Sequence, residues 1–350
     1  MRSMQIVDWG RPLELRRYDD PRPQGTEVLL EVTACGVCHT DLHLHDGYFD
    51  LGGGERLRVA DRGIRLPFTM GHEVVGTVLA LGPEAEGVRV GEQRLVHPWI
   101  GCGACAVCRR GEELLCLQPR IVGTWKDGGY SDRVLVPHAR YLVDYSGIPT
   151  SLAATLACSG VTAYSAVQKL GPLTDADSVL LVGAGGVGLA GLHLARALTS
   201  ARIIVADLGS AKRERALADG ATAVIDNAAP DALARLRDAT GGGAAAAIDF
   251  VGRPATARFA IDGLRKGGSL IVVGLYGDRL PLPLPLLPLR MLTLRGSYVG
   301  TLDELKALVR LVQDGRVPPI PVQERPLEDA NSALDELRAG RVLGRVVLVP

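Results

Sequence analysis

The second half of the chain alternates short apolar runs with amphipathic segments, and this alternation limits the fold more than any other feature. From residue 178 onward, six runs are typical of strands: SVLLVGAG, RIIVAD, AVID, AAAIDFV, SLIVVG and MLTLRG. Amphipathic segments separate the first five, at 187–198, 210–219, 230–239 and 254–264. Apolar strands separated by helices predict an α/β fold with a doubly wound, parallel, six-stranded sheet and right-handed crossovers.

The first of these runs ends in a glycine-rich turn, VGAGGVG, that opens the next helix. Gly183, Gly185 and Gly188 have the G-x-G-x-x-G spacing, with Gly186 and Val187 between the last two. Glycine here allows a tight turn, close approach of the backbone to a pyrophosphate, and packing of helix on strand, while the helix N-terminus favours phosphate. We expect this turn to bind a dinucleotide; a purely structural turn is the alternative.

An acidic residue at the end of the second strand indicates which dinucleotide binds. Asp207 lies where a carboxylate can hold a ribose 2′-OH, and its charge would repel a 2′-phosphate. Leu208 follows it, so we predict NAD; the nearby Lys212 and Arg213 leave NADP as the alternative. The predicted cofactor-binding set also includes Val273 and Ser297.

The first 150 residues have a different pattern. Short β-like runs, EVLLEVTA, VVGTVLALG, QRLVHPW and SDRVLVP, are broken by Gly and Pro, which predicts a mostly antiparallel β domain with long loops. The tail, 303–350, has two helical patterns and a final strand, and we expect it to pack back on the first domain. The apolar segment 280–290 fits either a subunit interface or a loop that covers the sheet edge.

Four of the seven cysteines lie within residues 101–116, GCGACAVCRRGEELLC. Cys102, Cys105, Cys108 and Cys116 match the closed four-thiolate shell of a structural zinc site. An iron–sulfur cluster is an alternative that the spacing fits poorly, and a disulfide pair is a third. Because a closed shell has no open position, we expect this lobe to stabilise the fold and to take no part in catalysis.

A second group of metal-binding residue types is spread along the chain. Cys38 lies in ACGVCHTDLH, His72 and Glu73 in GHE, and Cys158 in LACSG. Two cysteines and a histidine leave a fourth position open, as catalytic zinc requires. Each residue alone is more simply a buried cysteine or a hydrogen-bonded histidine. Their occurrence together with the dinucleotide turn and the cysteine lobe favours a metal centre.

Charge and hydropathy exclude two classes of partner. Lys plus Arg and Asp plus Glu number 39 each and no basic run stands out, so we expect no nucleic-acid binding. No apolar run reaches about eighteen residues and the N-terminus lacks an apolar signal segment, so we expect no membrane insertion and a cytoplasmic location. Clustered cysteines in a reducing compartment are typical of metal sites.

With the motifs GVCHTDLH, GHEVVGTV, the cysteine lobe and VGAGGVG with its downstream Asp207, the chain resembles a zinc-dependent medium-chain alcohol dehydrogenase along essentially its whole length. The resemblance implies a GroES-like catalytic domain over 1–159, with 300–350 packed on it, and a Rossmann NAD-binding domain over 160–299. It also implies two zinc ions per subunit, one catalytic and one structural, a small alcohol, aldehyde or ketone as substrate, and a homodimer or homotetramer.

Carried over position by position, the resemblance assigns the ligands of the catalytic zinc to Cys38, His72 and Cys158. Glu73 would lie beside the ion and approach it transiently. Asp41 would hydrogen-bond the ligand histidine and fix its tautomer, with a turn carboxylate as the alternative role. The bound zinc would act as a Lewis acid while hydride passes between the alcohol carbon and the nicotinamide.

The resemblance gives five further positions a role. Thr40 and His43 would relay the alcohol proton. His39 and Arg345 would contact the cofactor pyrophosphate, with solvated surface positions as the alternative. Trp99 would line the substrate pocket, and a plain core tryptophan is its alternative.

One segment departs from the family pattern. Residues 44–70, between His43 and His72, are longer than in the familiar members that act on short-chain alcohols, and the glycines at 52–54 suggest a mobile loop. Substrate preference is therefore not transferable. A polyol or other specialised alcohol dehydrogenase of the same family is one alternative, and a zinc-free enone or quinone reductase is another. A non-enzymatic dinucleotide sensor is a third.

Overall fold

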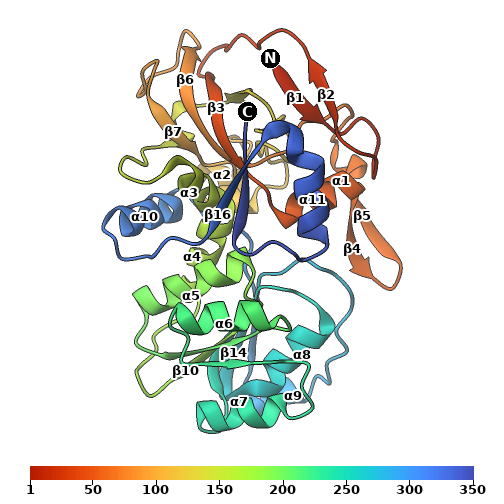
Figure 1. The fold of residues 1–350 in the computed structure, drawn as a ribbon, viewed down its shortest axis with the longest axis vertical. Helices are drawn as coiled ribbons and strands as arrows, with labels where there is room; N and C mark the ends of the chain where they lie inside the picture. The colour runs from red at the N-terminus through yellow and green to blue at the C-terminus, as the bar shows by residue number, and fades with distance from the viewer. The chain divides into compact units, whose positions relative to one another are not determined.

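The computed structural model describes all residues, 1–350, and the chain forms two compact units. Unit 1 comprises Met1–Tyr48, Arg58–Val161 and Gly300–Pro350. Unit 2 comprises Phe49–Leu57 and Thr162–Val299. A short segment from the first part of the chain thus belongs to the second unit (Figure 1).

Unit 2 is built on a parallel six-stranded sheet with the spatial order β12-β11-β10-β13-β14-β15. Its strands are β10 (Ser178–Val182), β11 (Arg202–Ala206), β12 (Ala223–Ile225), β13 (Ala244–Asp249), β14 (Leu264–Val272) and β15 (Thr293–Gly296). The strand order reverses direction at β10, which is the switch point of a doubly wound Rossmann sheet. The predicted sheet is confirmed, strand for strand.

Helices cover both faces of this sheet: α5 (Gly186–Leu198), α6 (Ser210–Ala218), α7 (Ala232–Thr240) and α8 (Pro254–Gly263). Figure 1 shows α5 and α6 on one side of the sheet and α7 on the other, where α7 packs against α8. Leu180, Ile204, Leu236 and Ile261 belong to the buried core that joins sheet and helices. Because both faces are covered, β10 is buried at every position and its sequence is continuously apolar rather than alternating.

Unit 1 is built on a mostly antiparallel sheet with the order β16-β17-β3-β6-β7-β9, and β8 also pairs with β3. The strands are β3 (Val28–Gly36), β6 (Glu73–Leu81), β7 (Gln93–Val96), β8 (Arg133–Val136), β9 (Leu142–Val143), β16 (Val322–Pro326) and β17 (Arg345–Val349). β16 and β17 run parallel to each other. The predicted antiparallel β domain is confirmed, and its four predicted runs are β3, β6, β7 and β8.

The C-terminal tail completes the sheet of unit 1. It forms α10 (Leu302–Gln313), α11 (Ala330–Arg338) and β17, and β17 pairs antiparallel with the end of β3. The Thr301 hydroxyl accepts from the Glu304 backbone N–H at 3.1 Å and the Glu304 carboxylate accepts from the Thr301 N–H at 2.7 Å, which fixes the start of α10.

The smaller elements of the two units are β1 (Arg2–Gln5), β2 (Glu14–Arg17), α1 (His39–Asp46), α2 (Ala106–Arg109), α3 (Thr150–Thr155), α4 (Val161–Gln168) and α9 (Leu286–Arg290).

The long segment between His43 and His72 contains a β-hairpin, β4 (Tyr48–Gly52) and β5 (Glu55–Arg58). Its glycines form the turn, and within unit 2 it packs on the loop that follows β14. A Cβ on Gly52 would lie 2.7 Å from the Asp278 Cα, and Arg279 lies 3.2 Å from Glu55. In place of the loop suggested by three glycines, the structure has a hairpin whose glycines allow close backbone packing.

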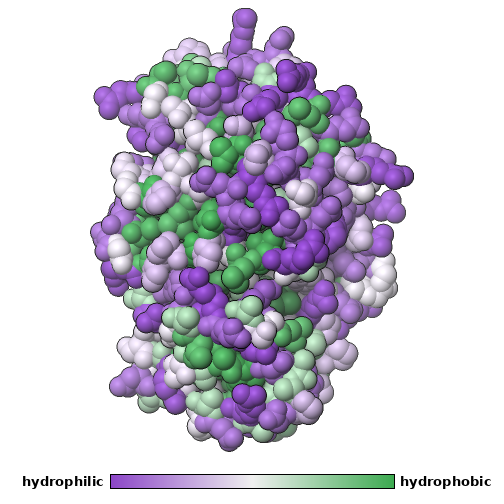
Figure 2. All heavy atoms as spheres, in the orientation of Figure 1, coloured by the Kyte–Doolittle hydropathy of each residue, from purple (hydrophilic) through white to green (hydrophobic).

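The surface in view is mixed in hydropathy. Figure 2 shows hydrophilic side chains interleaved with smaller apolar areas on the face in view. No helix is both long enough and apolar enough to span a bilayer.

Candidate functional site

Cys38, His72, Glu73 and Cys158 come together in unit 1, and all four are buried. Their ligand atoms lie within 4.8 Å of one another. Cys38 is the N-cap residue of α1. His72 immediately precedes β6, and Glu73 is the first residue of that strand. Cys158 lies in a π-helical turn, Leu156–Gly160, between α3 and α4. Segments that are distant in sequence therefore form one cluster. We call it the three-ligand centre, because the sulfurs of Cys38 and Cys158 and the imidazole of His72 are its strongest metal donors, and Glu73 lies beside them.

The donor atoms of the three-ligand centre fit a zinc ion. Two sulfurs that are each about 2.3 Å from a tetrahedral ion lie about 3.8 Å apart. The sulfurs of Cys38 and Cys158 are 3.9 Å apart. The Nε2 atom of His72 is buried without a hydrogen-bond partner, which costs free energy unless that nitrogen has a ligand. A bound metal ion would satisfy it.

The sulfurs of Cys38 and Cys158 are within hydrogen-bonding distance of each other. The hydrogen bond from Cys158 lowers the pKa of Cys38 well below its usual value, despite the opposing effect of burial. The same hydrogen bond, together with burial, raises the pKa of Cys158. Both sulfurs would bind a divalent cation as thiolates, with release of their protons.

Asp41 connects two of the ligand segments. Its Oδ1 lies 3.3 Å from the Nδ1 of His72, and its Oδ2 accepts from the backbone N–H of Cys38 at 2.8 Å. The Tyr130 hydroxyl also donates to Oδ2, at 3.1 Å. A carboxylate at Nδ1 favours the tautomer that carries its proton there, so the lone pair of Nε2 faces the sulfurs.

Glu73 forms a buried ion pair with Arg345. The two side chains approach to 2.5 Å, between Oε2 and Nη2. Gly36 is required here, because a Cβ at that position would lie 1.9 Å from the Glu73 Oε2. Burial raises the pKa of Glu73 to about 7, although Arg345 opposes this shift. The structure thus places Arg345, predicted as a phosphate contact, against a member of the three-ligand centre.

The predicted relay residues Thr40 and His43 follow Cys38 closely in sequence, and the predicted pocket residue Trp99 lies close to His72 in space. Helix α1 starts at His39 and carries Thr40 and His43 three residues apart, on one side of the helix. Burial lowers the pKa of His43, which favours the neutral imidazole that can accept a proton. The ring of Trp99 lies 5.4 Å from the ring of His72, and its indole N–H donates to the carbonyl of Ala157 at 2.9 Å.

The four cysteines of the lobe also converge. The sulfurs of Cys102 and Cys108 are 3.9 Å apart, as are those of Cys105 and Cys116. Backbone N–H groups point at two of them: Cys105 donates to the Cys102 sulfur, and Cys102 donates to the Cys116 sulfur, both at 3.3 Å. Backbone hydrogen bonds lower the pKa of Cys102 to about 6. Burial, by contrast, raises the pKa of Cys108 to about 12. The four-cysteine centre therefore has the sulfur spacing and the backbone donors of a closed zinc site.

The glycine-rich turn of unit 2 has the geometry that a dinucleotide needs. A Cβ on Gly188 would lie 1.8 Å from the carbonyl oxygen of Gly183, so this glycine allows α5 to pack on the strand. A Cβ on Gly185 would meet no atom within 4 Å, so the backbone there borders open space where a pyrophosphate fits. Gly186 and Val187 begin α5, whose N-terminus favours negative charge.

Asp207 lies beside this turn. One carboxylate oxygen accepts from the N–H of Ala184 at 2.7 Å, and the other accepts from the N–H of Gly209 at 2.8 Å. Arg213 donates to the carbonyls of Asp207 and Leu208, both at 2.7 Å. The Arg213 guanidinium is therefore hydrogen-bonded to backbone carbonyls. The Asp207 carboxylate is the charged group nearest to where a ribose 2′ substituent would lie.

The remaining predicted cofactor residues are distributed around the same edge of the sheet. Lys212 lies in α6, close to Gly209. Val273 follows β14, and its N–H donates to the carbonyl of Asp249 at 2.9 Å. Ser297 follows β15 and accepts from Lys169 at 3.0 Å. Carboxyl ends of parallel strands are where ligands bind in such sheets.

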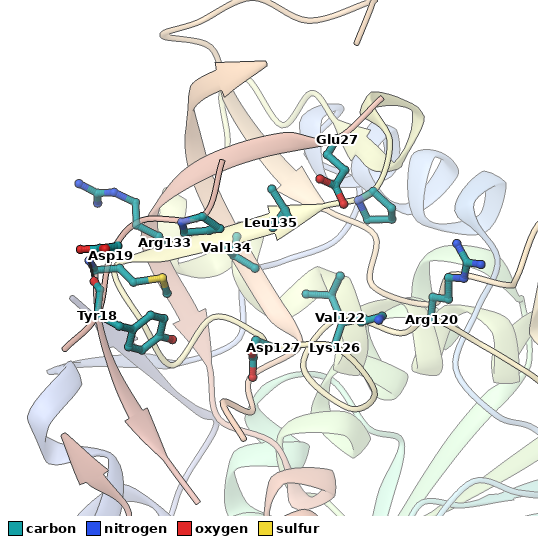
Figure 3. A pocket seen from close by; sticks show the side chains of 13 residues that line it. Tyr18, Asp19, Glu27, Arg120, Val122, Lys126, Asp127, Arg133, Val134 and Leu135 are labelled. Atoms are coloured by element: carbon teal, nitrogen blue, oxygen red, sulfur yellow. Dashed lines mark hydrogen bonds between the residues drawn. The ribbon is translucent and has the colours of Figure 1, made fainter. Parts of the chain in front are cut away.

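A hollow of about 430 Å³ in unit 1 lies outside these sites (Figure 3). Its walls carry charges of both signs, including Glu27, Asp127, Arg120, Lys126 and Arg133. None of the predicted site residues lines it. We therefore assign the chemistry to the three-ligand centre and the glycine-rich turn.

Several residues that hydrogen-bond to the surroundings of the two metal-binding clusters were not predicted from the sequence. Tyr130 and Tyr141 donate to carboxylates beside the two metal centres, and Glu113 accepts from the backbone of the cysteine lobe. Arg345 was predicted as a phosphate contact, but its ion pair with Glu73 was not predicted. No spacing rule connects these residues, because their contacts depend on tertiary packing.

Comparisons with known proteins agree with this geometry. The family model of the alcohol dehydrogenase GroES-like domain matches residues 24–147, and that of the zinc-binding dehydrogenases matches residues 186–314. The chain is 39% identical over 352 residues to the NAD-dependent alcohol dehydrogenase of Sulfurisphaera tokodaii, with 100% of both chains covered. It is 32% identical over 349 residues to the D-arabinose 1-dehydrogenase (NADP(+)) of Saccharolobus solfataricus, with 99% of this chain and 96% of the relative covered.

A solved structure shows the same fold over the whole chain. The crystal structure of the alcohol dehydrogenase from Aeropyrum pernix matches with a TM-score of 0.90 at 32% identity, and the match covers 100% of both chains. Both family models, the full-length relatives and the two metal-binding clusters lead to the same assignment. The chain belongs to the zinc-dependent medium-chain alcohol dehydrogenases.

Proposed function

We propose that this protein interconverts a primary or secondary alcohol and its aldehyde or ketone by hydride transfer to and from NAD. The observation that carries the proposal is the buried three-ligand centre, whose ligand atoms lie within 4.8 Å of one another and whose two sulfurs are 3.9 Å apart. Cys38, His72 and Cys158 would hold a zinc ion, which when bound would supply Lewis acidity that makes an alcohol proton easier to remove. A second zinc ion would be held by the four-cysteine centre and would support the fold.

The protein's own residues then have separate tasks. Asp41 holds the His72 ring through Nδ1 and the Cys38 segment through its backbone N–H. The hydroxyl of Thr40 accepts the alcohol proton and passes one on towards the neutral imidazole of His43. The glycine-rich turn and Asp207 hold the cofactor whose nicotinamide accepts the hydride. In the reverse direction the same groups return the proton to the substrate oxygen.

The substrate class is tested by measuring initial rates of NAD and NADP reduction with zinc-loaded protein and a panel of primary, secondary, cyclic and aromatic alcohols. A sugar belongs in the panel because of the D-arabinose 1-dehydrogenase relative, which makes sugar oxidation the second candidate. A polyol is included as the substrate of another kind of alcohol dehydrogenase in the same family. A rate above background with any of these substrates supports the proposal. A protein that binds no zinc and reduces an enone or quinone instead would overturn it.

Cofactor choice gives a direct prediction. Asp207→Gly lowers the kcat/KM for NAD relative to that for NADP by at least about tenfold, because a charged hydrogen bond contributes about 1.5–3 kcal/mol. The variant also removes the charge that repels a 2′-phosphate. Steady-state kinetics with both cofactors at a fixed alcohol concentration measure the ratio.

Glu214→Gln is the matched control for that experiment. Glu214 is an exposed acid on α6, and its replacement removes one negative charge without touching the glycine-rich turn. Its cofactor ratio stays at the wild-type value. If Asp207→Gly leaves the ratio unchanged, the ribose assignment is wrong.

We also propose that the protein forms a homo-oligomer through one edge of the unit 2 sheet. β15 is an edge strand with all four residues exposed, and the segment before it exposes Leu284, Leu289 and Met291 at 73%, 71% and 66%. A bare strand edge beside exposed apolar side chains is a surface that another chain can cover. A second copy of the chain offers the same edge.

Introducing charge into this surface tests the assembly. Leu289→Glu together with Met291→Glu shifts the protein to monomers at micromolar concentration, because each carboxylate would be buried without a partner. Analytical ultracentrifugation measures the mass. Val90→Glu, at a residue that is 62% exposed in unit 1, is the control and leaves the mass unchanged. A monomeric wild-type protein would exclude the oligomer.

A further inference from the structure

We propose that two buried tyrosines, Tyr130 and Tyr141, are positioning residues that each brace one metal centre through a carboxylate. This inference rests on the proposed zinc sites. Both tyrosines are in unit 1, at 0% and 3% exposure, and neither is part of the proposed chemistry. What they share is a three-part chain of hydrogen bonds: tyrosine hydroxyl, carboxylate, and backbone N–H of a ligand cysteine or of the residue before it.

The first brace serves the three-ligand centre. The Tyr130 hydroxyl donates to the Oδ2 of Asp41 at 3.1 Å, and the same oxygen accepts from the Cys38 N–H at 2.8 Å. The other oxygen of Asp41 lies 3.3 Å from the Nδ1 of His72. The hydroxyl therefore fixes the rotation of a carboxylate that contacts two ligand residues at once.

The ring of Tyr130 is itself held in place. A Cβ on Gly71 would lie 2.4 Å from the Cδ1 of Tyr130, so the ring packs directly on the residue before His72. The Tyr130 backbone N–H donates to the carbonyl of Met70 at 2.9 Å, and its carbonyl accepts from Met4 at 2.8 Å. Both the backbone and the ring of Tyr130 are thereby tied to the segment that carries the ligand histidine.

The second brace serves the four-cysteine centre. The Tyr141 hydroxyl donates to the Oε2 of Glu113 at 2.8 Å, and this oxygen accepts from the Gly101 N–H at 2.8 Å. Gly101 precedes Cys102, and a Cβ on it would lie 2.5 Å from the Cys108 sulfur. The Glu113 carboxylate thus holds the loop that lies directly against a ligand sulfur.

Removal of either hydroxyl has a defined physical effect. The carboxylate keeps its charge but loses one donor, so its orientation is less fixed and the ligand segment that it holds becomes more mobile. Partners of metal ligands outside the coordination shell typically change metal affinity by about 10–100-fold when removed. We expect the rate of zinc release from the braced centre to rise about tenfold.

Tyr130→Phe and Tyr141→Phe test the proposal in the full-length, zinc-loaded protein, and each variant is the control for the other. Both keep the ring and lose a buried hydroxyl that donates to a carboxylate. Zinc release to a chromophoric chelator is followed over time. Cobalt substitution assigns each phase, because a centre with two sulfurs and a nitrogen differs in its visible spectrum from a centre with four sulfurs.

The expected result is selective. Tyr130→Phe accelerates release from the three-ligand centre and leaves the four-cysteine centre unchanged, while Tyr141→Phe does the reverse. In the Asp41→Asn background, the further change Tyr130→Phe has a smaller effect than in the wild type, because the hydroxyl acts through Asp41.

Three outcomes would overturn the inference in different ways. Unchanged release from both centres in both variants would show that the hydroxyls do not brace them, while the proposed function would stand. Equal acceleration at both centres in each variant would indicate general loss of stability rather than positioning. A wild-type protein that holds no zinc would refute the proposed metal sites, and the braces with them.

Discussion

Replacing Cys38 with serine abolishes turnover and leaves the fold largely intact. A serine hydroxyl stays protonated at neutral pH and is a poor zinc ligand, so the three-ligand centre loses one of its two sulfur ligands. Lewis-acid assistance is worth several kcal/mol, which corresponds to a loss in kcat of about a thousandfold or more. Initial rates of NAD reduction measure the loss, and far-UV circular dichroism together with thermal unfolding verifies the fold.

Cys35→Ser is the matched control for this variant. Cys35 lies three residues away in β3 and is fully buried, but it belongs to neither metal cluster. The variant carries the same chemical change, cysteine to serine, at a residue outside both metal clusters. Turnover per folded molecule therefore remains near the wild-type value. Substantial activity in the Cys38 variant would mean that the ligand set is wrong.

Cys105→Ser has its main effect on stability. It removes one of four thiolates from a closed site, and structural zinc contributes free energy directly to folding. We expect the Tm to fall by about 10 °C. A loss of about 3 kcal/mol in unfolding free energy would produce this fall, because each 1 kcal/mol shifts the Tm by about 2–4 °C in a domain of 150–250 residues. Activity at low temperature, per folded molecule, changes much less, because no residue of this lobe takes part in the proposed proton or hydride transfer.

Differential scanning calorimetry of the wild type and the variant, each with and without a strong chelator, checks this prediction. Chelation lowers the Tm of the wild type towards that of the variant and has little further effect on the variant's first transition. Melting at the wild-type temperature in Cys105→Ser would show that the four cysteines do not hold a stabilising ion.

The sequence was sufficient for those parts of the fold that depend on local patterns. The strands β10, β11 and β13 are mostly apolar because helices cover the sheet, and all six strands from β10 to β15 were predicted individually. The two metal-binding groups could be predicted because cysteine and histidine have few other reasons to cluster. Their convergence in the structure agrees with that prediction, and the ligand roles themselves are now open to the tests above.

What the sequence did not reveal depends on contacts between distant segments. The ion pair of Glu73 and Arg345 joins residues 272 positions apart. They meet because β3 pairs with β6, which carries Glu73, and with β17, which carries Arg345. Tyr130 and Asp41 are likewise 89 positions apart. The hairpin of β4 and β5 was missed for another reason: three glycines in succession suggest mobility, whereas here they permit close packing.

The membership of Phe49–Leu57 in unit 2 has a consequence for dissecting this protein. The backbone passes between the two units four times, after residues 48, 57, 161 and 299, rather than twice. A recombinant fragment of residues 162–299 would therefore lack the hairpin on which its own 277–279 loop packs, and would expose that loop to water. Likewise, a single protease cut at 161 or at 299 would leave the two units covalently linked.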